Sequence, residues 1–279
     1  AEVTPAVKSY EGFTAPIAQT VAIAADGSLV VTYNYTRNKY ALTWEANGGN
    51  ISGNYTKGDV KFGASITAPL NANVTKTGSN FLGWNPSVIP ATMPAETLTF
   101  VAQWEAKTFT GITFTSEDEN EGTVSVNPQK NEYTYGDNVT ITATAAEGYE
   151  FSGWSDGNND VERTITVTES TTSLTATFSP KTNISYTVRF WKQNLNDDEY
   201  TEQLPAEYRT GTTGALTNAA AVAKVYDGFE QLSFDEKIIA GDGSTVVDIY
   251  YNRLTFQIRF LVEGIEKQSE NQHFDDTHV

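Results

Sequence analysis

The sequence predicts a mostly β protein, with a minor helical contribution, in which small modules follow one another along the chain. Three observations lead to this prediction. Strand-forming Thr, Val, Tyr and Phe alternate with turn residues throughout, and 21 glycines supply turns. A Gly–aromatic motif recurs four times, and residues 10–37 return, 216 positions later, at 226–253. Recurrence in register is typical of repeat architectures.

The recurring motif is clearest at residues 148–154, Gly-Tyr-Glu-Phe-Ser-Gly-Trp, and at 78–84, Gly-Ser-Asn-Phe-Leu-Gly-Trp. Shorter relatives stand at 10–13 and 226–229. A small module buries little apolar surface, and each buried aromatic side chain contributes roughly 1.5–3 kcal/mol. We therefore interpret these aromatic side chains as core residues. The alternative is that the tryptophans lie on the surface and stack on a ligand.

The motif poses a geometric problem, because Phe151 and Trp154 point to opposite faces of a straight strand. Gly153 lies between them and can host a β-bulge, which turns Trp154 inward. We therefore predict that Phe151 and Trp154 are both buried in their own module.

The chain begins with a partial module. Residues 1–39, the leading segment, match the C-terminal part of residues 181–254, the third module: Gly-Phe, Asp-Gly-Ser, Val-Val and Arg return in register. Within the leading segment, residues 29–35 are predicted to form a strand.

Residues 40–107 form a first module and residues 108–180 a second. Each begins with an alternating strand, continues through a second strand to the motif, and closes with another alternating strand, at 98–104 and 174–178. The two motifs are 70 positions apart, since 148 follows 78 by that number.

The third module begins with a strand at 186–191, with which residues 200–208 are expected to pair. Residues 215–224, rich in alanine, are the one stretch with helix-forming composition. Residues 255–279, the trailing segment, are predicted to be the start of a further module. We expect the two partial segments to be frayed, packed on a neighbour, or completed by another chain through edge-strand addition.

Composition excludes several classes of function. The chain carries 18 Lys and Arg against 35 Asp and Glu, so we exclude nucleic acid and anionic lipid heads as partners. There is no cysteine, and the two histidines, His273 and His278, lie in the last seven residues. Thiolate metal sites and histidine chemistry in the body of the chain are therefore excluded. No apolar run could span a membrane, and any signal peptide or wall-sorting motif is expected outside this segment.

The motifs also resemble known families. The Asn-Gly-Gly turn at 47–49, the motif at 78–84 and the Ala-Gln-Trp end at 102–104 together resemble the Listeria–Bacteroides repeat, the internalin-B-type B-repeat. Residues 108–180 are similar to its divergent form. Residues 181–254, and the leading segment by duplication, are similar to mucin-binding-protein-like repeats, although no Gly-Trp follows Gly228-Phe229. The resemblance implies small β-grasp-like modules in an elongated array on the outside of a bacterial cell.

We therefore predict a non-enzymatic repeat segment of an extracellular bacterial surface protein, acting as a stalk or spacer with an adhesion role. We expect no catalytic residue, metal or cofactor, because modules this small cannot enclose the paired carboxylates of a glycosidase. Residues 156–160 alternate oxygen ligands as a calcium loop does, but they lack its later Gly and Glu, so we interpret them as a solvated loop.

The alternative function is a module that binds a glycan or a protein on a host or a neighbouring cell. Its candidate ligand-binding residues are Trp191, Tyr200 and Tyr208, because exposed aromatic side chains stack on sugars and grip proteins. We expect a monomer that makes end-to-end contacts.

Overall fold

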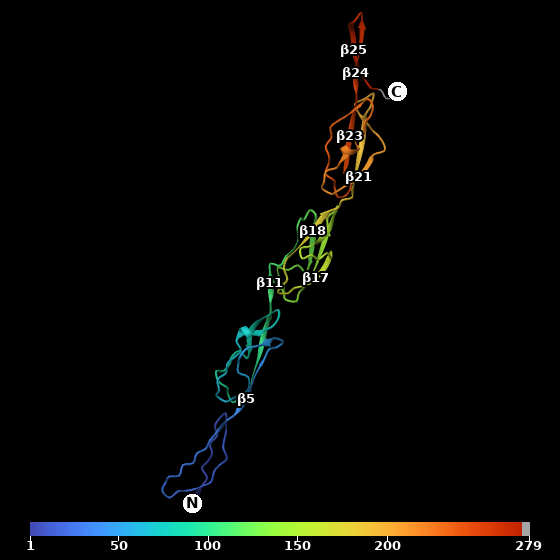
Figure 1. Cartoon of the computed structure of the whole chain (residues 1–279). Coiled ribbons are helices and arrows are strands. Elements are labelled where there is room, and N and C mark those ends of the chain that lie inside the picture. The colour runs from blue at the N-terminus through green and yellow to red at the C-terminus, as the bar shows by residue number, and fades with distance from the viewer. Residues whose placement is uncertain (275–279) are drawn as a thin grey trace. The chain divides into compact units, whose positions relative to one another are not determined.

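A computed structural model describes residues 1–274, and it confirms a mostly β fold (Figure 1). The chain divides into two compact units. The first unit comprises Ala1–Ile112, Lys130–Asn138 and Thr166–Thr171. The second unit comprises Thr113–Gln129, Val139–Ile165 and the chain from Thr172 onward. Residues 275–279 of the predicted trailing segment, with His278, lie outside the described residues.

The first module is built on a four-stranded sheet in the order β7-β5-β10-β9. Its strands are β5 (Lys39–Glu45), β7 (Gly58–Lys61), β9 (Ser79–Asn85) and β10 (Leu98–Ala106). The central strands β5 and β10 are parallel, and the outer two are antiparallel to them. Alternation in β5 places Leu42 and Trp44 on one face, where they join Phe100 and Met93 in a buried cluster. The short strands β6 (Asn50–Ile51) and β8 (Val74–Thr75) pair beside η1 (Asn71–Asn73).

The second module contains three small sheets. In one, β18 (Leu174–Pro180) lies between β12 (Phe114–Ser116), which is parallel to it, and β16 (Tyr149–Trp154), which is antiparallel. A second sheet has the order β13 (Gly122–Asn127), β15 (Asn138–Ala145) and β17 (Glu162–Thr166). In the first unit, β11 (Thr108–Thr110) pairs with β14 (Glu132–Thr134). Alternate residues of β15, namely Val139, Ile141 and Ala143, are buried.

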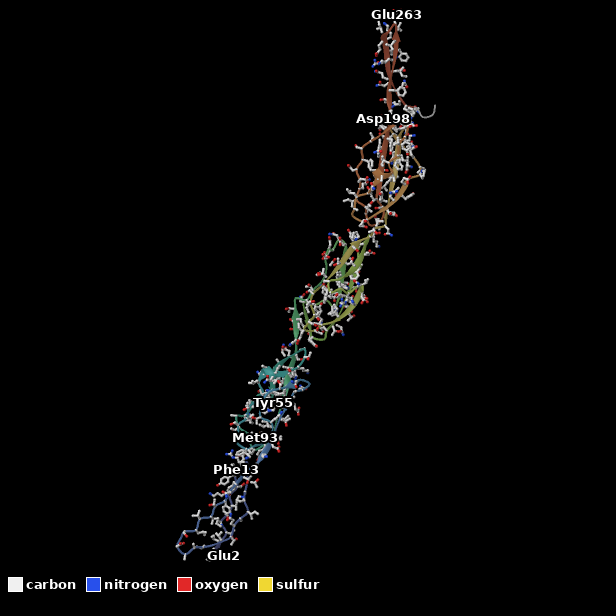
Figure 2. All side chains as sticks on the ribbon, in the orientation of Figure 1. Glu2, Phe13, Tyr55, Met93, Asp198 and Glu263 are labelled. Carbon is white, nitrogen blue, oxygen red and sulfur yellow. The ribbon has the colours of Figure 1, made fainter. Side chains whose placement is uncertain are left out.

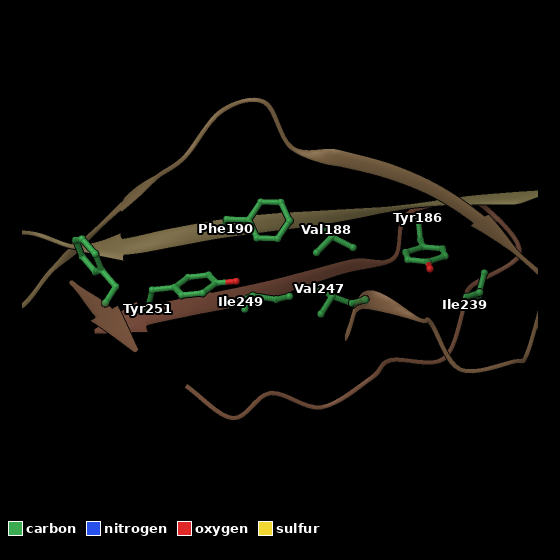
Figure 3. Packing of buried hydrophobic residues seen from close by; sticks show 9 residues of the cluster. Tyr186, Val188, Phe190, Ile239, Val247, Ile249 and Tyr251 are labelled. Atoms are coloured by element: carbon green, nitrogen blue, oxygen red, sulfur yellow. The ribbon is translucent and has the colours of Figure 1, made fainter. Parts of the chain in front are cut away.

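The third module repeats the plan of the first. Parallel strands β19 (Ile184–Gln193) and β23 (Val246–Arg253) lie at the centre, flanked by β21 (Glu207–Gly211) and β22 (Phe229–Gln231). The additional strand β20 (Tyr200–Glu202) also pairs with β19, so the predicted return of residues 200–208 is confirmed. Figure 3 shows Val188 and Phe190 of β19 beside Val247, Ile249 and Tyr251 of β23 in one buried cluster.

The predicted helix at 215–224 is wrong. The structure has only the 3-10 turn η2 (Ala219–Val222) there. So short an apolar stretch gains little from helix formation in isolation. Its backbone N–H groups at Ala219 and Ala220 instead donate to the carboxylate of Glu236, each at 2.9 Å, while Ala219 and Val222 pack in the core cluster.

The leading segment contains only short strands: β1 (Glu2–Val3) pairs with β3 (Val21–Ala22), and β2 (Phe13–Thr14) with β4 (Thr36–Arg37). The predicted strand at 29–35 is wrong, because these residues pair with no strand among residues 1–274. The duplication is nevertheless visible in side-chain packing. Tyr10 and Tyr35 form a T-shaped pair at 4.9 Å, as Tyr226 and Tyr251 do at the same distance.

The described part of the trailing segment is an antiparallel hairpin of β24 (Thr255–Val262) and β25 (Ile265–His273). Every residue of both strands is exposed (Figure 2, where Glu263 marks its turn).

Candidate functional site

The Gly–aromatic motif at 148–154 forms the predicted bulge. In β16, Phe151 pairs with Phe178 and Gly153 with Thr177, so Ser152 is the extra residue. Gly153 has a φ of 146°, which favours glycine, and the bulge turns Trp154 inward. The Phe151 and Trp154 rings lie 5.7 Å apart, and Trp154 is 3 % exposed while Phe151 is half-buried.

The same device recurs at 78–84. Gly83 has a φ of 126°, the register of β10 shifts at Gln103 and Trp104, and Phe81 lies 5.3 Å from Trp84. Trp84 is 8 % exposed. The interpretation as core residues is therefore confirmed for Trp84 and Trp154, which are not available to stack on a ligand. Phe81 and Phe151, which were predicted to be buried with them, are only half-buried, because each lies on the other side of the bulge from its tryptophan.

A second recurrent feature lies where one module meets the next. At the end of the second module, the Lys181 N–H donates to the Gly148 carbonyl at 2.8 Å. The Lys181 carbonyl then accepts from the Thr213 N–H at 3.0 Å. Thr213 also donates through its hydroxyl to the Gly148 carbonyl, at 2.8 Å, and is itself buried. A motif glycine, a linker residue and a residue of the next module are thus joined in series.

We call this arrangement the junction, and it occurs four times. In every junction the linker N–H donates to the motif glycine carbonyl, and the linker carbonyl accepts from the following module, at 2.8–3.0 Å. Two junctions lie in each compact unit. The other three sets are Gly12, Asn38 and Phe62; Gly78, Lys107 and Tyr135; and Gly228, Leu254 and Phe274.

In each junction, the side chain of the residue that comes from the following module also lies against the motif glycine. A methyl group added at Gly12, Gly78 or Gly228 would overlap an aromatic side chain, that of Phe62, Tyr135 or Phe274 respectively. Each glycine therefore permits a close approach that alanine would prevent.

In three of the four junctions, the residue that comes from the following module is also fixed to that module. Phe62, Tyr135 and Thr213 are each followed by a glycine whose N–H donates to a carbonyl of the same module, at 2.8–2.9 Å. The acceptors are Met93, Val167 and Ile239. Sequence reasoning missed the junctions, although the Phe-Gly, Tyr-Gly and Thr-Gly pairs at 62–63, 135–136 and 213–214 were a usable signal.

An ion pair adds to the junction between the first and second modules. The Lys107 ammonium donates to the carboxylate of Glu169, and this hydrogen bond and charge lower the pKa of Glu169. Both side chains are exposed, so the pair contributes little to stability.

A separate candidate site lies on the outer face of the third module. Trp191 stacks on Tyr250 with ring centroids 6.0 Å apart and planes 17° apart. Tyr200 meets Tyr250 edge-on at 5.0 Å, and its hydroxyl donates to Asn252. We call Trp191, Tyr200 and Tyr250 the aromatic face. All three remain partly exposed.

Charged groups hold the aromatic face in place. Asp248 accepts from Trp191 Nε1 at 2.7 Å and from Arg189 Nε at 2.9 Å. The guanidinium lies 5.4 Å from the centre of the Trp191 ring, within range of a cation–π interaction. The hydrogen bond to Asp248 raises the pKa of Arg189, which stays charged. The rings are thus oriented before any ligand binds.

The structure brings two of the three candidate residues together. Tyr208, on β21, is 77 % exposed and pairs with Thr187 of β19. Thr187 is four residues from Trp191 along β19, a separation of about 13 Å in a strand. Tyr208 lies outside the aromatic face. Sequence reasoning missed Tyr250, which alternation could have found, because Val247, Ile249 and Tyr251 point inward and leave Tyr250 on the outer face.

The acidic loop at 156–160 is engaged by protein groups. Arg163 Nη1 donates to both oxygens of Asp156, at 2.9 and 2.8 Å. Burial raises the pKa of Asp156, but hydrogen bonds from the Asn158 backbone and from Arg163 outweigh it and lower the pKa. Within residues 1–274, no three acidic or histidine side chains are grouped to hold a metal ion.

Comparison with known families defines the class of protein. Residues 40–103 match the Listeria–Bacteroides repeat domain, and residues 112–193 match the divergent InlB B-repeat domain. Two parts of the chain thus match B-repeat families of the predicted kinds. The second match continues past residue 180 into β19.

Repeats of these two families are typical of bacterial surface proteins and are generally non-catalytic. No curated protein and no solved structure matches the chain. No helix in the described part of the chain is long and apolar enough to cross a membrane.

Proposed function

We propose that the chain is a non-enzymatic spacer segment of a bacterial cell-surface protein, which holds another part of that protein away from the cell. The observation that carries this proposal is the junction, which recurs four times between modules of different sequence. A spacer needs each module to be held to its neighbour, and a junction does this with two backbone hydrogen bonds and one close side-chain contact against the motif glycine. The B-repeat matches favour the same function.

The modules are best interpreted as variants of one β-grasp-like plan. With the additional strand β20 left aside, the orders β7-β5-β10-β9 and β21-β19-β23-β22 follow one pattern. In both, the strands that come first and fourth in the chain lie at the centre, with the second beside the first and the third beside the fourth. The central pair is parallel in both sheets. In such an array the stability of the chain is close to the sum of its modules and their nearest-neighbour contacts.

Small-angle scattering of the whole chain tests the spacer function. We expect a distance distribution with one short maximum, set by the width of a module, and a long tail, because a spacer requires its modules to follow one another in an extended array. A symmetric distribution, typical of a compact particle, would contradict the proposal. So would a broad, featureless profile typical of freely jointed modules.

A second function, binding of a glycan or protein on another cell, is favoured by the aromatic face. Its three rings are partly exposed, pre-oriented and framed by the ion pair of Arg189 and Asp248. Flat rings beside charged groups suit sugars, whose apolar faces stack and whose hydroxyls form hydrogen bonds. The resemblance of the third module to mucin-binding-protein-like repeats favours the same ligand class.

A glycan array probed with the whole chain tests this second function. Tyr250→Ala removes the ring that Trp191 and Tyr200 share, so we expect binding to weaken by about tenfold or more, as at other aromatic hot spots. Tyr208→Ala is the matched control, since it removes an exposed tyrosine of the same module outside the aromatic face. Absence of binding by the unaltered chain, or equal losses in the two variants, would contradict an adhesive role for this face.

A further inference from the structure

In each of the three modules, the first and the last strand of one sheet are neighbours and run parallel. These strands are β5 and β10 in the first module, β12 and β18 in the second, and β19 and β23 in the third. We call them the terminal pair of the module. Because both strands of a pair point the same way, the chain enters the pair at one end and leaves it at the other.

Tension along the chain acts on a terminal pair in a particular direction. It pulls the first strand by its N-terminal end and the last strand by its C-terminal end. In a parallel pair these ends lie opposite each other, so the two strands are drawn past each other along their length. The evenly spaced hydrogen bonds of a parallel ladder then share the load and must break together. When both pulled ends lie at the same end of a pair, the bonds are instead loaded one after another.

The three terminal pairs differ in length. The ladder is longest in the third module, intermediate in the first and shortest in the second. The paired residues are 187–192 with 246–251, 42–45 with 98–101, and 114–116 with 174–176 respectively. Because more hydrogen bonds share the load in a longer ladder, the third module offers the clearest case.

Side chains reinforce the terminal pair of the third module. On the outer face, Arg189 of β19 forms an ion pair with Asp248 of β23, and Trp191 stacks on Tyr250. On the inner face, alternate side chains of both strands are buried in one cluster, namely Val188, Phe190, Val247 and Ile249 (Figure 3). Sliding of β19 past β23 breaks these contacts together with the ladder, so they bear part of the same load.

We propose that the terminal pairs are load-bearing clamps, which keep the modules folded when the chain is under tension. The proposal rests on the spacer function, since a spacer transmits to the cell the drag on the part that it holds away. It adds that the direction of the force, and not only the stability of a module, decides whether the module unfolds. The aromatic face, whose Trp191 and Tyr250 stand on the two clamp strands, then stays assembled under load.

Single-molecule force spectroscopy of the whole chain tests the proposal. The chain has no cysteine, so two introduced cysteines are the only points at which thiol-linked tethers attach. Asn183→Cys with Leu254→Cys places the tethers at opposite ends of the third clamp. Asn183→Cys with Ser244→Cys is the matched control, because residue 244 precedes β23 and lies at the same end of the clamp as residue 183. All three native side chains are exposed.

The two variants should differ in how fast the third module unfolds under the same constant force. We expect unfolding at least about tenfold slower between residues 183 and 254 than between 183 and 244, because several hydrogen bonds must break together rather than singly. Forced unfolding is governed by the unfolding rate. Each rate is therefore divided by the rate of the same variant without force, obtained in denaturant, which removes any difference in stability between the variants.

Equal rates for the two variants, or slower unfolding of the control, would overturn the proposal, because the parallel pair would then carry no particular load. Scattering of the chain without tethers judges the spacer function separately. An extended particle with equal rates would keep the spacer function and remove the clamps. A compact particle with unequal rates would remove the spacer function and leave the clamps.

Discussion

Trp154→Ala is expected to unfold the second module and to leave the first and third modules folded. Trp154 is buried beside Phe151, and its indole N–H donates to the Asp160 carbonyl at 2.9 Å. Removing a buried tryptophan costs ~3–5 kcal/mol. A module of this size has a total stability of only ~3.5–10 kcal/mol, at 0.05–0.15 kcal/mol per residue. The loss is therefore comparable to the whole stability of the module.

Hydrogen exchange resolved along the chain measures this effect. Amides of β15, β16 and β18 should lose protection, whereas those of β5, β10 and β19 should keep it. Val161→Ala, at an exposed position of the same module, is the control and should change little. Unchanged protection in the second module, or loss of protection along the whole chain, would contradict the interpretation of Trp154.

Phenylalanine substitutions separate the packing of the ring from its hydrogen bond. Trp154→Phe keeps an aromatic side chain but removes the donor to Asp160, at a cost of ~0.5–1.5 kcal/mol beyond the loss of packing. Trp84 provides the comparison, because its buried Nε1 has no hydrogen-bond partner among residues 1–274. Trp84→Phe should therefore destabilise its module less than Trp154→Phe destabilises the second.

Gly148→Ala is expected to open the junction between the second and third modules while both stay folded. Gly148 has a φ of 83°, a conformation that costs other residues ~1–2 kcal/mol. An added methyl group would also overlap the backbone of Gly241 and lie 2.7 Å from the Thr213 hydroxyl. Because one of these neighbours is backbone, relief requires the two modules to separate. Overpacking of this kind adds ~1–3 kcal/mol.

The exchange rates of two junction amides report on this opening. The N–H groups of Lys181 and Thr213 donate within the junction, so in Gly148→Ala both should exchange at least about tenfold faster, the equivalent of 1.4 kcal/mol. Gly157→Ala is the matched control, because its φ of 85° carries the same backbone penalty but an added methyl meets nothing within 4 Å. Equal effects of the two substitutions would mean that the close approach at Gly148 does not hold the junction.

The sequence was informative where one local feature decides the structure. Gly153 sits between two aromatic residues that must face inward together, and a bulge at the glycine is the direct way to achieve this. Alternation likewise predicted the central strands, because one face of each sheet is buried. The glycine motif and the alternating strands both occur in the first and second modules, so the pattern in one module supported the prediction for the other.

Prediction from the sequence failed where contacts with residues distant in the sequence determine the local structure. Residues 215–224 favour a helix by composition, but their backbone donors are taken by Glu236. The strand predicted at 29–35 has suitable residues but pairs with no strand in the part of the chain that the structure describes. The junction at Thr213 was missed for a similar reason. Its counterparts are aromatic, and its fit against Gly148 depends on Gly241, which is far away in the sequence.

The junctions also bear on how such chains grow during evolution. Their two hydrogen bonds join backbone atoms, so the linker residue can be Asn38, Lys107, Lys181 or Leu254 without changing the connection. The chemistry therefore places few demands on the identity of the module that follows. Insertion or deletion of a whole module therefore regenerates a joint with the same backbone hydrogen bonds, provided that the new neighbour also places a side chain against the motif glycine.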